Sequence, residues 1–153
     1  MRSRWTALFG VLVLAGLAPR DGYAQPGSPQ TPPRKASSIG GLSQNFPNPM
    51  NPETWIKFTV GDPPACTNSG HLYSVTLKIF NTIQQTIAIP VWQSSGGVAG
   101  GQQINKLQLA CGEHTAYWNG KILNAQQEAA SGVYVYELGV DGQKFTKKMT
   151  VVK

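Results

Sequence analysis

This chain has few histidine, cysteine and acidic residues, which are the side chains that most active sites use. Its 153 residues include two histidines, His71 and His114, and seven acidic side chains. No GxSxG, HExxH or phosphate-loop motif occurs. His114 falls in a segment leading to Trp118, where a structural or exposed histidine is expected rather than a general base. The acids mostly lie beside turns, without the spacing of a catalytic pair: Glu53, Asp62, Glu113, Glu128, Glu137 and Asp141. We therefore expect no enzyme, no cofactor and no metal site.

Long apolar runs are also missing. The apolar segment that begins at Trp5 stops at Ala18, short of the roughly 20 residues that a membrane span needs. Arg2 and Arg4 precede it, and small residues around Ala24 follow it, which is the pattern of a secretory signal peptide over residues 1–24. A membrane anchor is the alternative. We expect an exported protein of the periplasm, outer surface or medium, which is not an integral membrane protein after cleavage.

The charge pattern gives no sign of a nucleic-acid partner. Cleavage after Ala24 would reduce Lys+Arg from 13 to 10 and Asp+Glu from 7 to 6, which leaves a net charge of +4. Apart from Lys147 and Lys148, this excess is spread along the chain and is not interleaved with aromatic residues. We expect the charge to serve solubility.

The two cysteines, Cys66 and Cys111, remain in the exported part. An even number of cysteines in an oxidising compartment favours a disulfide. Metal binding is the alternative, but two cysteines without CxxC spacing make a poor zinc site. We expect a structural cross-link.

Residues 25–41 are rich in proline, serine, glycine and glutamine, with almost no apolar side chains, and predict a flexible tether. Alternating apolar residues then predict strands, for example Ile56, Phe58 and Val60 on one face. Seven such segments follow one another: 54–60, 71–80, 85–92, 103–111, 113–118, 132–140 and 144–153. With turn signals between them, they indicate one domain over residues 42–153. The expected fold is an all-β, immunoglobulin-like antiparallel sandwich of about seven strands.

One of these segments carries an additional expectation. In residues 85–92, the alternation places Ile87, Ile89 and Val91 on one face, and Pro90 favours an edge strand because it lacks an N–H. Turns are expected at Asn119-Gly120 and at Asp141-Gly142.

Five segments occur in one order along the chain: LSQNFPNPMNPETWIKFTV (42–60), VTLKIFNTIQQTI (75–87), GEHTAYWNG (112–120), SGVYVYEL (131–138) and TKKMTVVK (146–153). This series resembles the C-terminal module shared by FlgD-like immunoglobulin domains and the type A sorting domains of the type IX secretion system. The resemblance covers residues 42–153. It departs from the family at Met50, where Phe is usual, and in the two cysteines and the glycine-rich insert SSGGVAGGQQ.

The Asn-Pro block has a structural interpretation. Its prolines fix φ and favour extended neighbours, so the block is a rigid lead into the first strand. Phe46, with Met50, is expected to plug the end of the sandwich. The residues that carry the resemblance are assigned structural roles: Asn45, Phe46, Pro47, Asn48, Pro49, Asn51, Pro52, Trp118, Gly120, Gly132 and Tyr134.

The resemblance implies a non-catalytic module that acts by protein–protein contact with an envelope or secretion-machinery protein. Such modules normally follow a large cargo protein, and almost nothing precedes this one, so we expect the sandwich itself to be the working part. The alternative is a small secreted carbohydrate-binding module for a surface polysaccharide. Trp55 and Trp92 are expected to face outward on their strands and form its ligand face, with Tyr117 and Tyr134 as further rings. An exposed aromatic row on one sheet would favour sugar binding.

Overall fold

The computed structural model describes residues 38–93, 101–123 and 127–153. Within these ranges every regular element is a β-strand. The strands are β1 (Gly40–Leu42), β2 (Thr54–Val60), β3 (Leu72–Phe80), β4 (Thr86–Ala88), β5 (Val91–Gln93), β6 (Asn105–Ala110), β7 (Gly112–Trp118), β8 (Gly132–Val140) and β9 (Gln143–Val151). The predicted signal peptide, and residues 25–37 of the predicted tether, lie outside the described ranges.

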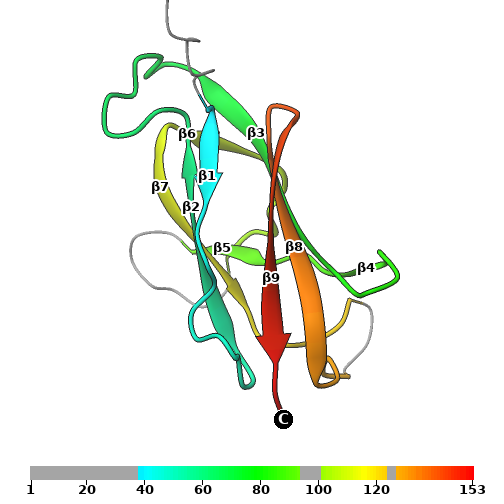
Figure 1. Ribbon diagram of the computed structural model, residues 1–153. Coiled ribbons are helices and arrows are strands. Elements are labelled where there is room, and N and C mark those ends of the chain that lie inside the picture. The colour runs from blue at the N-terminus through cyan, green and yellow to red at the C-terminus, as the bar shows by residue number, and fades with distance from the viewer. Residues whose placement is uncertain (1–37, 94–100, 124–126) are drawn as a thin grey trace, which may run out of the picture. The chain divides into compact units, whose positions relative to one another are not determined.

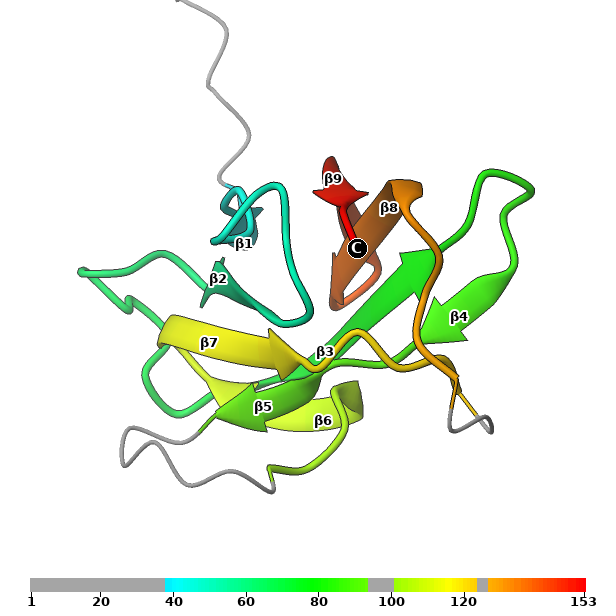
Figure 2. The same cartoon turned by 90° about the horizontal axis from the view of Figure 1, so that it is seen from below.

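The strands form two antiparallel sheets that pack face to face (Figures 1 and 2). Sheet A has the order β1-β2-β7-β5, and sheet B has the order β4-β3-β8-β9. Strand β6 also belongs to sheet B: it pairs with the first half of β3, on the same edge on which β4 pairs with the end of β3. In immunoglobulin terms these are strands A-B-E-D and C′-C-F-G, with β6 added. The predicted all-β sandwich is therefore confirmed, with nine strands rather than about seven.

Residues 85–92 account for one of the two extra strands. Instead of the single strand expected here, the structure has two short strands, β4 in sheet B and β5 in sheet A. The chain crosses from one sheet to the other at Ile89 and Pro90. The predicted common face is wrong, since Ile87 and Ala88 are adjacent in sequence and both are buried. Both short strands lie at sheet edges, as the proline predicted.

The other extra strand, β1, begins inside the segment that composition assigned to the tether. Gly40 pairs with Val60 at the edge of sheet A. A Cβ at Gly40 would lie 2.9 Å from the carbonyl oxygen of Thr59 and 3.1 Å from a methyl carbon of Val140. The absence of a side chain thus lets this strand close the gap between the two sheets, and the sandwich begins before Leu42.

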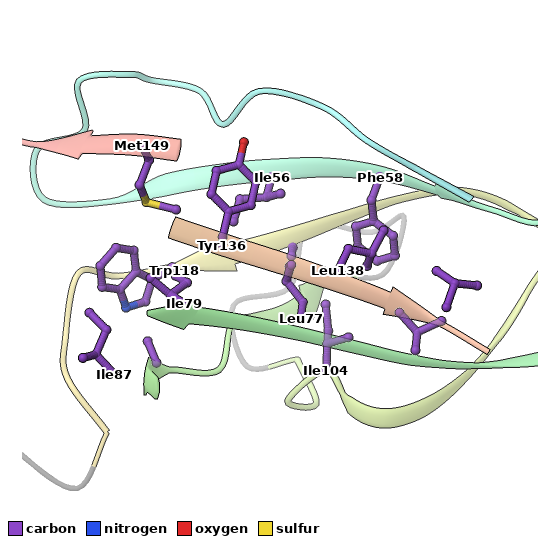
Figure 3. Packing of buried hydrophobic residues seen from close by; sticks show 14 of the residues in the cluster. Ile56, Phe58, Leu77, Ile79, Ile87, Ile104, Trp118, Tyr136, Leu138 and Met149 are labelled. Carbon is purple, nitrogen blue, oxygen red and sulfur yellow. The ribbon is translucent and has the colours of Figure 1, made fainter. Parts of the chain in front are cut away.

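The core fills the space between the sheets with the alternating residues of β2, β3, β7, β8 and β9 (Figure 3). Tyr136, Leu138, Leu77 and Ile79 come from the central strands of sheet B and are fully buried. Phe58, Ile56 and Trp118 face them from sheet A. Alternation thus predicted the inward faces of these strands correctly.

The end of the sandwich that holds the β8–β9 turn is cross-linked. Cys66, in the β2–β3 loop, forms a disulfide with Cys111, between β6 and β7, which confirms the expected pairing. Asp141 and Gly142 form the β8–β9 turn, both with positive φ, as the Asp-Gly pair predicted. We call this the disulfide end.

Candidate functional site

The Asn-Pro block forms the opposite end of the sandwich and is fixed there by buried hydrogen bonds. The Asn45 side chain donates to the carbonyl oxygen of Pro47 at 2.9 Å and to the hydroxyl of Thr54 at 3.0 Å. The backbone N–H of Asn45 donates to the Tyr136 hydroxyl at 3.0 Å, and that hydroxyl donates to the carbonyl of Ser43 at 2.8 Å. Asn45 and Thr54 are the two buried polar residues in the described ranges, and each satisfies the other.

The middle of the block pairs with the last strand. Met50 is fully buried and forms a parallel bridge with Val151, with backbone bonds from Met50 N–H to Thr150 and from Val152 N–H to Met50. The Asn48 side chain accepts the N–H of Thr150 at 3.0 Å. These contacts join segments about a hundred residues apart and fix the block against β9, as its expected rigidity requires.

Phe46 does not plug the sandwich. Its side chain is 77% exposed, whereas Met50 is fully buried in the core. Phe46 pairs backbone to backbone with Trp55, with both N–H···O distances at 2.9 Å, so its ring lies on the outer face of sheet A.

The remaining motif residues gather at the same end. Gly120 has a φ of 76°, and a Cβ there would lie 2.3 Å from the carbonyl oxygen of Pro52, so only glycine lets the two segments touch. The Trp118 indole N–H donates to the carbonyl of Lys121 at 2.9 Å. The Tyr134 hydroxyl donates to the carbonyl of Ala130, four residues upstream, at 2.9 Å, which is the tyrosine corner of immunoglobulin-like sandwiches.

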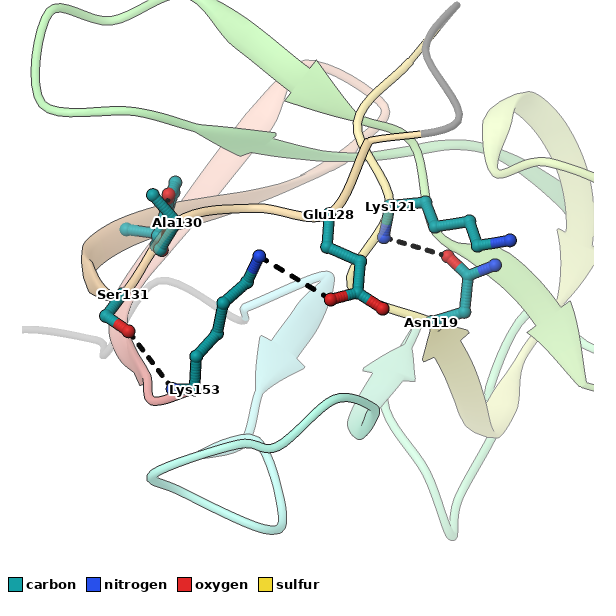
Figure 4. A network of polar contacts seen from close by, with 7 residues as sticks. Asn119, Lys121, Glu128, Ala130, Ser131 and Lys153 are labelled. Atoms are coloured by element: carbon teal, nitrogen blue, oxygen red, sulfur yellow. Dashed lines mark hydrogen bonds and ion pairs between the residues drawn. The ribbon is translucent and has the colours of Figure 1, made fainter.

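Polar contacts at this end involve the last residue of the chain (Figure 4). The backbone N–H of Lys153 donates to the Ser131 hydroxyl at 3.0 Å, and its ammonium lies 3.5 Å from a carboxylate oxygen of Glu128. The Asn119 side chain accepts the N–H of Lys121 at 3.1 Å, which shapes the turn after β7. We call residues 45, 47–52, 118–121, 128–134 and 150–153 the motif end; Phe46, whose ring lies on the outer face of sheet A, is not counted in it.

A second surface lies on the outer face of sheet A. Phe46, Trp55 and Tyr117 are consecutive partners across three neighbouring segments, so their rings share one face. Trp55 is 38% exposed, and its ring centroid is 5.6 Å from that of Tyr117. The Tyr117 hydroxyl donates to the Glu53 carboxylate at 2.6 Å, and this bond, with some burial, raises the pKa of Tyr117. We call the three rings the aromatic row.

Trp92 is not part of this row. It pairs with Ala116, whose side chain points into the core, so Trp92 also faces inward. Its indole N–H donates to Nδ1 of His114 at 3.3 Å, and it packs against the core. The predicted ligand face of Trp55 and Trp92 is therefore wrong, because the two rings lie on opposite faces of sheet A. The prediction assumed that inward and outward residues alternate without interruption through Pro90, but the chain changes sheets there.

A shallow hollow of about 380 Å³ adjoins the row. It is lined by Gln44, Phe46, Trp55, Lys57 and Thr115. The aromatic carbons thus lie beside an ammonium, a hydroxyl and an amide, the mixture of apolar and polar groups usual in ligand sites.

Potential catalytic groups are dispersed over the described part of the chain. No group of three or more His, Cys, Asp or Glu residues there could hold a metal ion. His71 lies 2.9 Å from the Asp141 carboxylate at the disulfide end, and His114 contacts the carbonyl of Ala110 at 2.9 Å. Each histidine is accounted for by a contact with neighbouring structure.

Within residues 38–93, 101–123 and 127–153, no helix is long and apolar enough to cross a membrane. Comparisons with protein-family models, with curated proteins and with solved structures find no match to this chain.

Proposed function

We propose that this protein is an exported, non-catalytic immunoglobulin-like module that acts by contact with another protein in the cell envelope or at the cell surface. The motif end is the contact surface. The observation that carries this proposal is convergence: segments that resemble the sorting and FlgD-like modules lie far apart in the sequence and meet at one end of the sandwich.

The motif end has the properties of a preformed recognition surface. Its backbone is fixed by the bonds of Asn45, Asn48 and Met50, so little conformational entropy is lost on binding. Its outer side chains remain accessible, including Asn51, Pro52, Asn119 and Val152, which is 43% exposed. A rigid surface with one exposed apolar residue, Val152, among polar side chains suits a protein partner.

Export is part of the same proposal. A disulfide such as that between Cys66 and Cys111 forms and persists in oxidising compartments, and the N-terminal pattern is that of a signal peptide; both observations support export.

Site-specific photo-crosslinking in the producing cell tests the contact. A photoreactive residue at Asn119 should give one discrete adduct with an envelope protein, whereas the same residue at Asn68, exposed in the loop of the disulfide end, should not. Val152→Glu should abolish the adduct from position 119 while the thermal midpoint of the purified protein is kept. Equal adducts from both positions, or an adduct indifferent to Val152→Glu, would contradict the proposal.

A further inference from the structure

The aromatic row is a second surface that the proposed contact at the motif end does not use. In the described residues, six large apolar side chains are exposed, and two of them, Phe46 and Trp55, lie on the outer face of sheet A. The backbone of each residue is paired with a neighbouring segment: Phe46 pairs with Trp55, and Trp55 pairs with Tyr117. Rings on such strands form a fixed platform, unlike rings on a free loop.

The position of each ring is determined by its neighbours. Tyr117 is restrained by its hydroxyl bond to Glu53, and its ring supports the indole of Trp55 at an interplanar angle of 50°. Phe46 extends the row on the other side of Trp55. The indole thus has its orientation set before any ligand arrives, which lowers the entropic cost of stacking.

Charge is placed asymmetrically about the row. Glu53, directly before β2, precedes Trp55 by two residues, and Lys57 in β2 follows it by two, so the two charges flank the indole. The Glu53 carboxylate accepts the Tyr117 hydroxyl, whereas Lys57 is exposed and makes no ion pair with any described residue. Lys57 also lines the hollow, together with the hydroxyl of Thr115. An anionic ligand group is therefore favoured on the Lys57 side and disfavoured on the Glu53 side.

We propose that the aromatic row and the adjoining hollow form a binding site for an acidic oligosaccharide of the uronate class. The C–H face of one pyranose ring stacks on Trp55, with Phe46 flanking the next ring. The carboxylate of the sugar points to the Lys57 ammonium, and ring hydroxyls reach Thr115 and the amide oxygen of Gln44, whose amide nitrogen already donates to Asn45 and to the carbonyl of Lys148. This mode of binding is independent of the contact proposed at the motif end.

The surroundings of the row favour a sugar over a protein. A stable protein interface covers about 800 Å² on each partner and has an apolar centre. Beyond the row, the outer face of sheet A presents Val91 beside Tyr117 and otherwise the polar side chains of Lys57, Thr59, Glu113 and Thr115, so the apolar area does not extend past the row and this one neighbour. The hollow of about 380 Å³ is at the low end of the range for small-ligand sites and suits a short oligosaccharide.

Calorimetric titration of the purified protein with hexagalacturonate at low salt tests the proposal. The matched neutral probe is the same oligosaccharide with its carboxyl groups methyl-esterified. We expect the acid to bind and the ester to bind more weakly. Trp55→Ala should weaken binding of the acid by about tenfold or more. Lys57→Gln should reduce affinity for the acid several-fold and leave affinity for the ester unchanged.

Two further variants separate the site from the fold. Phe46→Ala removes a mostly exposed ring, so it should keep the thermal midpoint and still weaken binding. Trp92→Phe changes the tryptophan on the opposite face and should leave binding unchanged. The proposal is overturned by failure of the acid to bind at millimolar concentration, by equal affinity for acid and ester, or by equal effects of Trp55→Ala and Trp92→Phe. A photoreactive residue at Phe46 that captures an envelope protein, with no sugar bound, overturns it as well.

Discussion

The backbone N–H of Asn45 donates to the phenolic oxygen of Tyr136, 3.0 Å away and 91 residues later in the chain. The same oxygen donates to the carbonyl of Ser43. A single buried hydroxyl therefore fastens the segment leading into the Asn-Pro block to the centre of sheet B. This bond links the first conspicuous motif of the sequence to the core of the fold.

Replacing Tyr136 with Phe should lower the free energy of unfolding by about 1–3 kcal/mol, because a buried N–H and a carbonyl lose their partner. Urea unfolding measures the change. Tyr134→Phe is the matched control, since the bond it removes is exposed and should matter less. A larger loss for Tyr134→Phe would place the critical hydroxyl at the tyrosine corner instead.

Alkaline pH should destabilise the protein through the same side chain. Burial raises the pKa of Tyr136, while the N–H of Asn45 opposes this in part. Because the folded pKa lies above the unfolded value of about 10, the contribution of this group is complete below pH 10 and is lost as the pH rises through the folded pKa. Wild type should therefore lose stability more steeply above pH 10 than Tyr136→Phe does. Parallel pH profiles would contradict this.

Met50 and Phe46 belong to the same Asn-Pro block, but replacing them with alanine should change the stability of the fold by very different amounts. Met50→Ala empties the end of the core and should cost about 2–5 kcal/mol. Phe46→Ala removes a side chain that is 77% exposed and should change stability by less than about 0.5 kcal/mol. Thermal and urea unfolding of both variants decide the matter. Similar losses would mean that Phe46 enters the core.

Reduction of the disulfide should destabilise the fold. Cys66 and Cys111 are separated by 45 positions, and the chain-entropy model gives about 4 kcal/mol for a loop of that length. Unfolding with and without reductant, and of the Cys66→Ser/Cys111→Ser double variant, measures this. The reduced protein and the double variant should agree. Unchanged stability in both would show that the cross-link adds nothing to the sandwich.

Acid pH should act at the disulfide end. The hydrogen bond from His71, followed by the N–H of Ser74, lowers the pKa of Asp141. A folded pKa below the unfolded value means that the contribution is present above about pH 4 and is lost as the pH falls through the folded pKa. Asp141→Asn keeps a residue that tolerates the positive φ of the turn but cannot titrate. The variant should lose less stability than wild type between pH 4 and pH 2, as followed by circular dichroism.

Alternation alone predicted the long strands and their inward faces. Ile56 and Phe58 in β2, and Tyr136 and Leu138 in β8, are buried as the period of two requires. This succeeds because these strands lie in the interior of one sheet, with one face to the core along their length. The cysteine pairing followed from compartment and number in the same way.

The failures arise where three-dimensional context overrides the pattern. An alternating run can continue through Pro90 while the chain changes sheets, so the face of Trp92 was assigned wrongly. Gly40 carries no hydrophobic signal, and its strand is apparent only from its closeness to Thr59. Whether Phe46 or Met50 fills the core depends on the bridge of Met50 to Val151.

The candidate site shows the same division. The outward phase of Trp55 could be predicted from its strand. Its pairing with Phe46 and Tyr117 could not, because strand register fixes which rings lie side by side. The convergence of the motif end likewise requires pairing between Met50 and β9, which no local pattern encodes.

The chain enters the sandwich at one end and leaves it at the other. Gly40 lies beside Val60 near the disulfide end, whereas Val151 lies beside Met50 at the motif end (Figure 1). A pulling force on the two flanks therefore runs along the strands and loads the β1–β2 and β8–β9 ladders in shear, perpendicular to their hydrogen bonds. Several bonds then share the load, and the disulfide prevents the segment between Cys66 and Cys111 from extending. The sandwich between Gly40 and Val151 therefore resists extension along its strands.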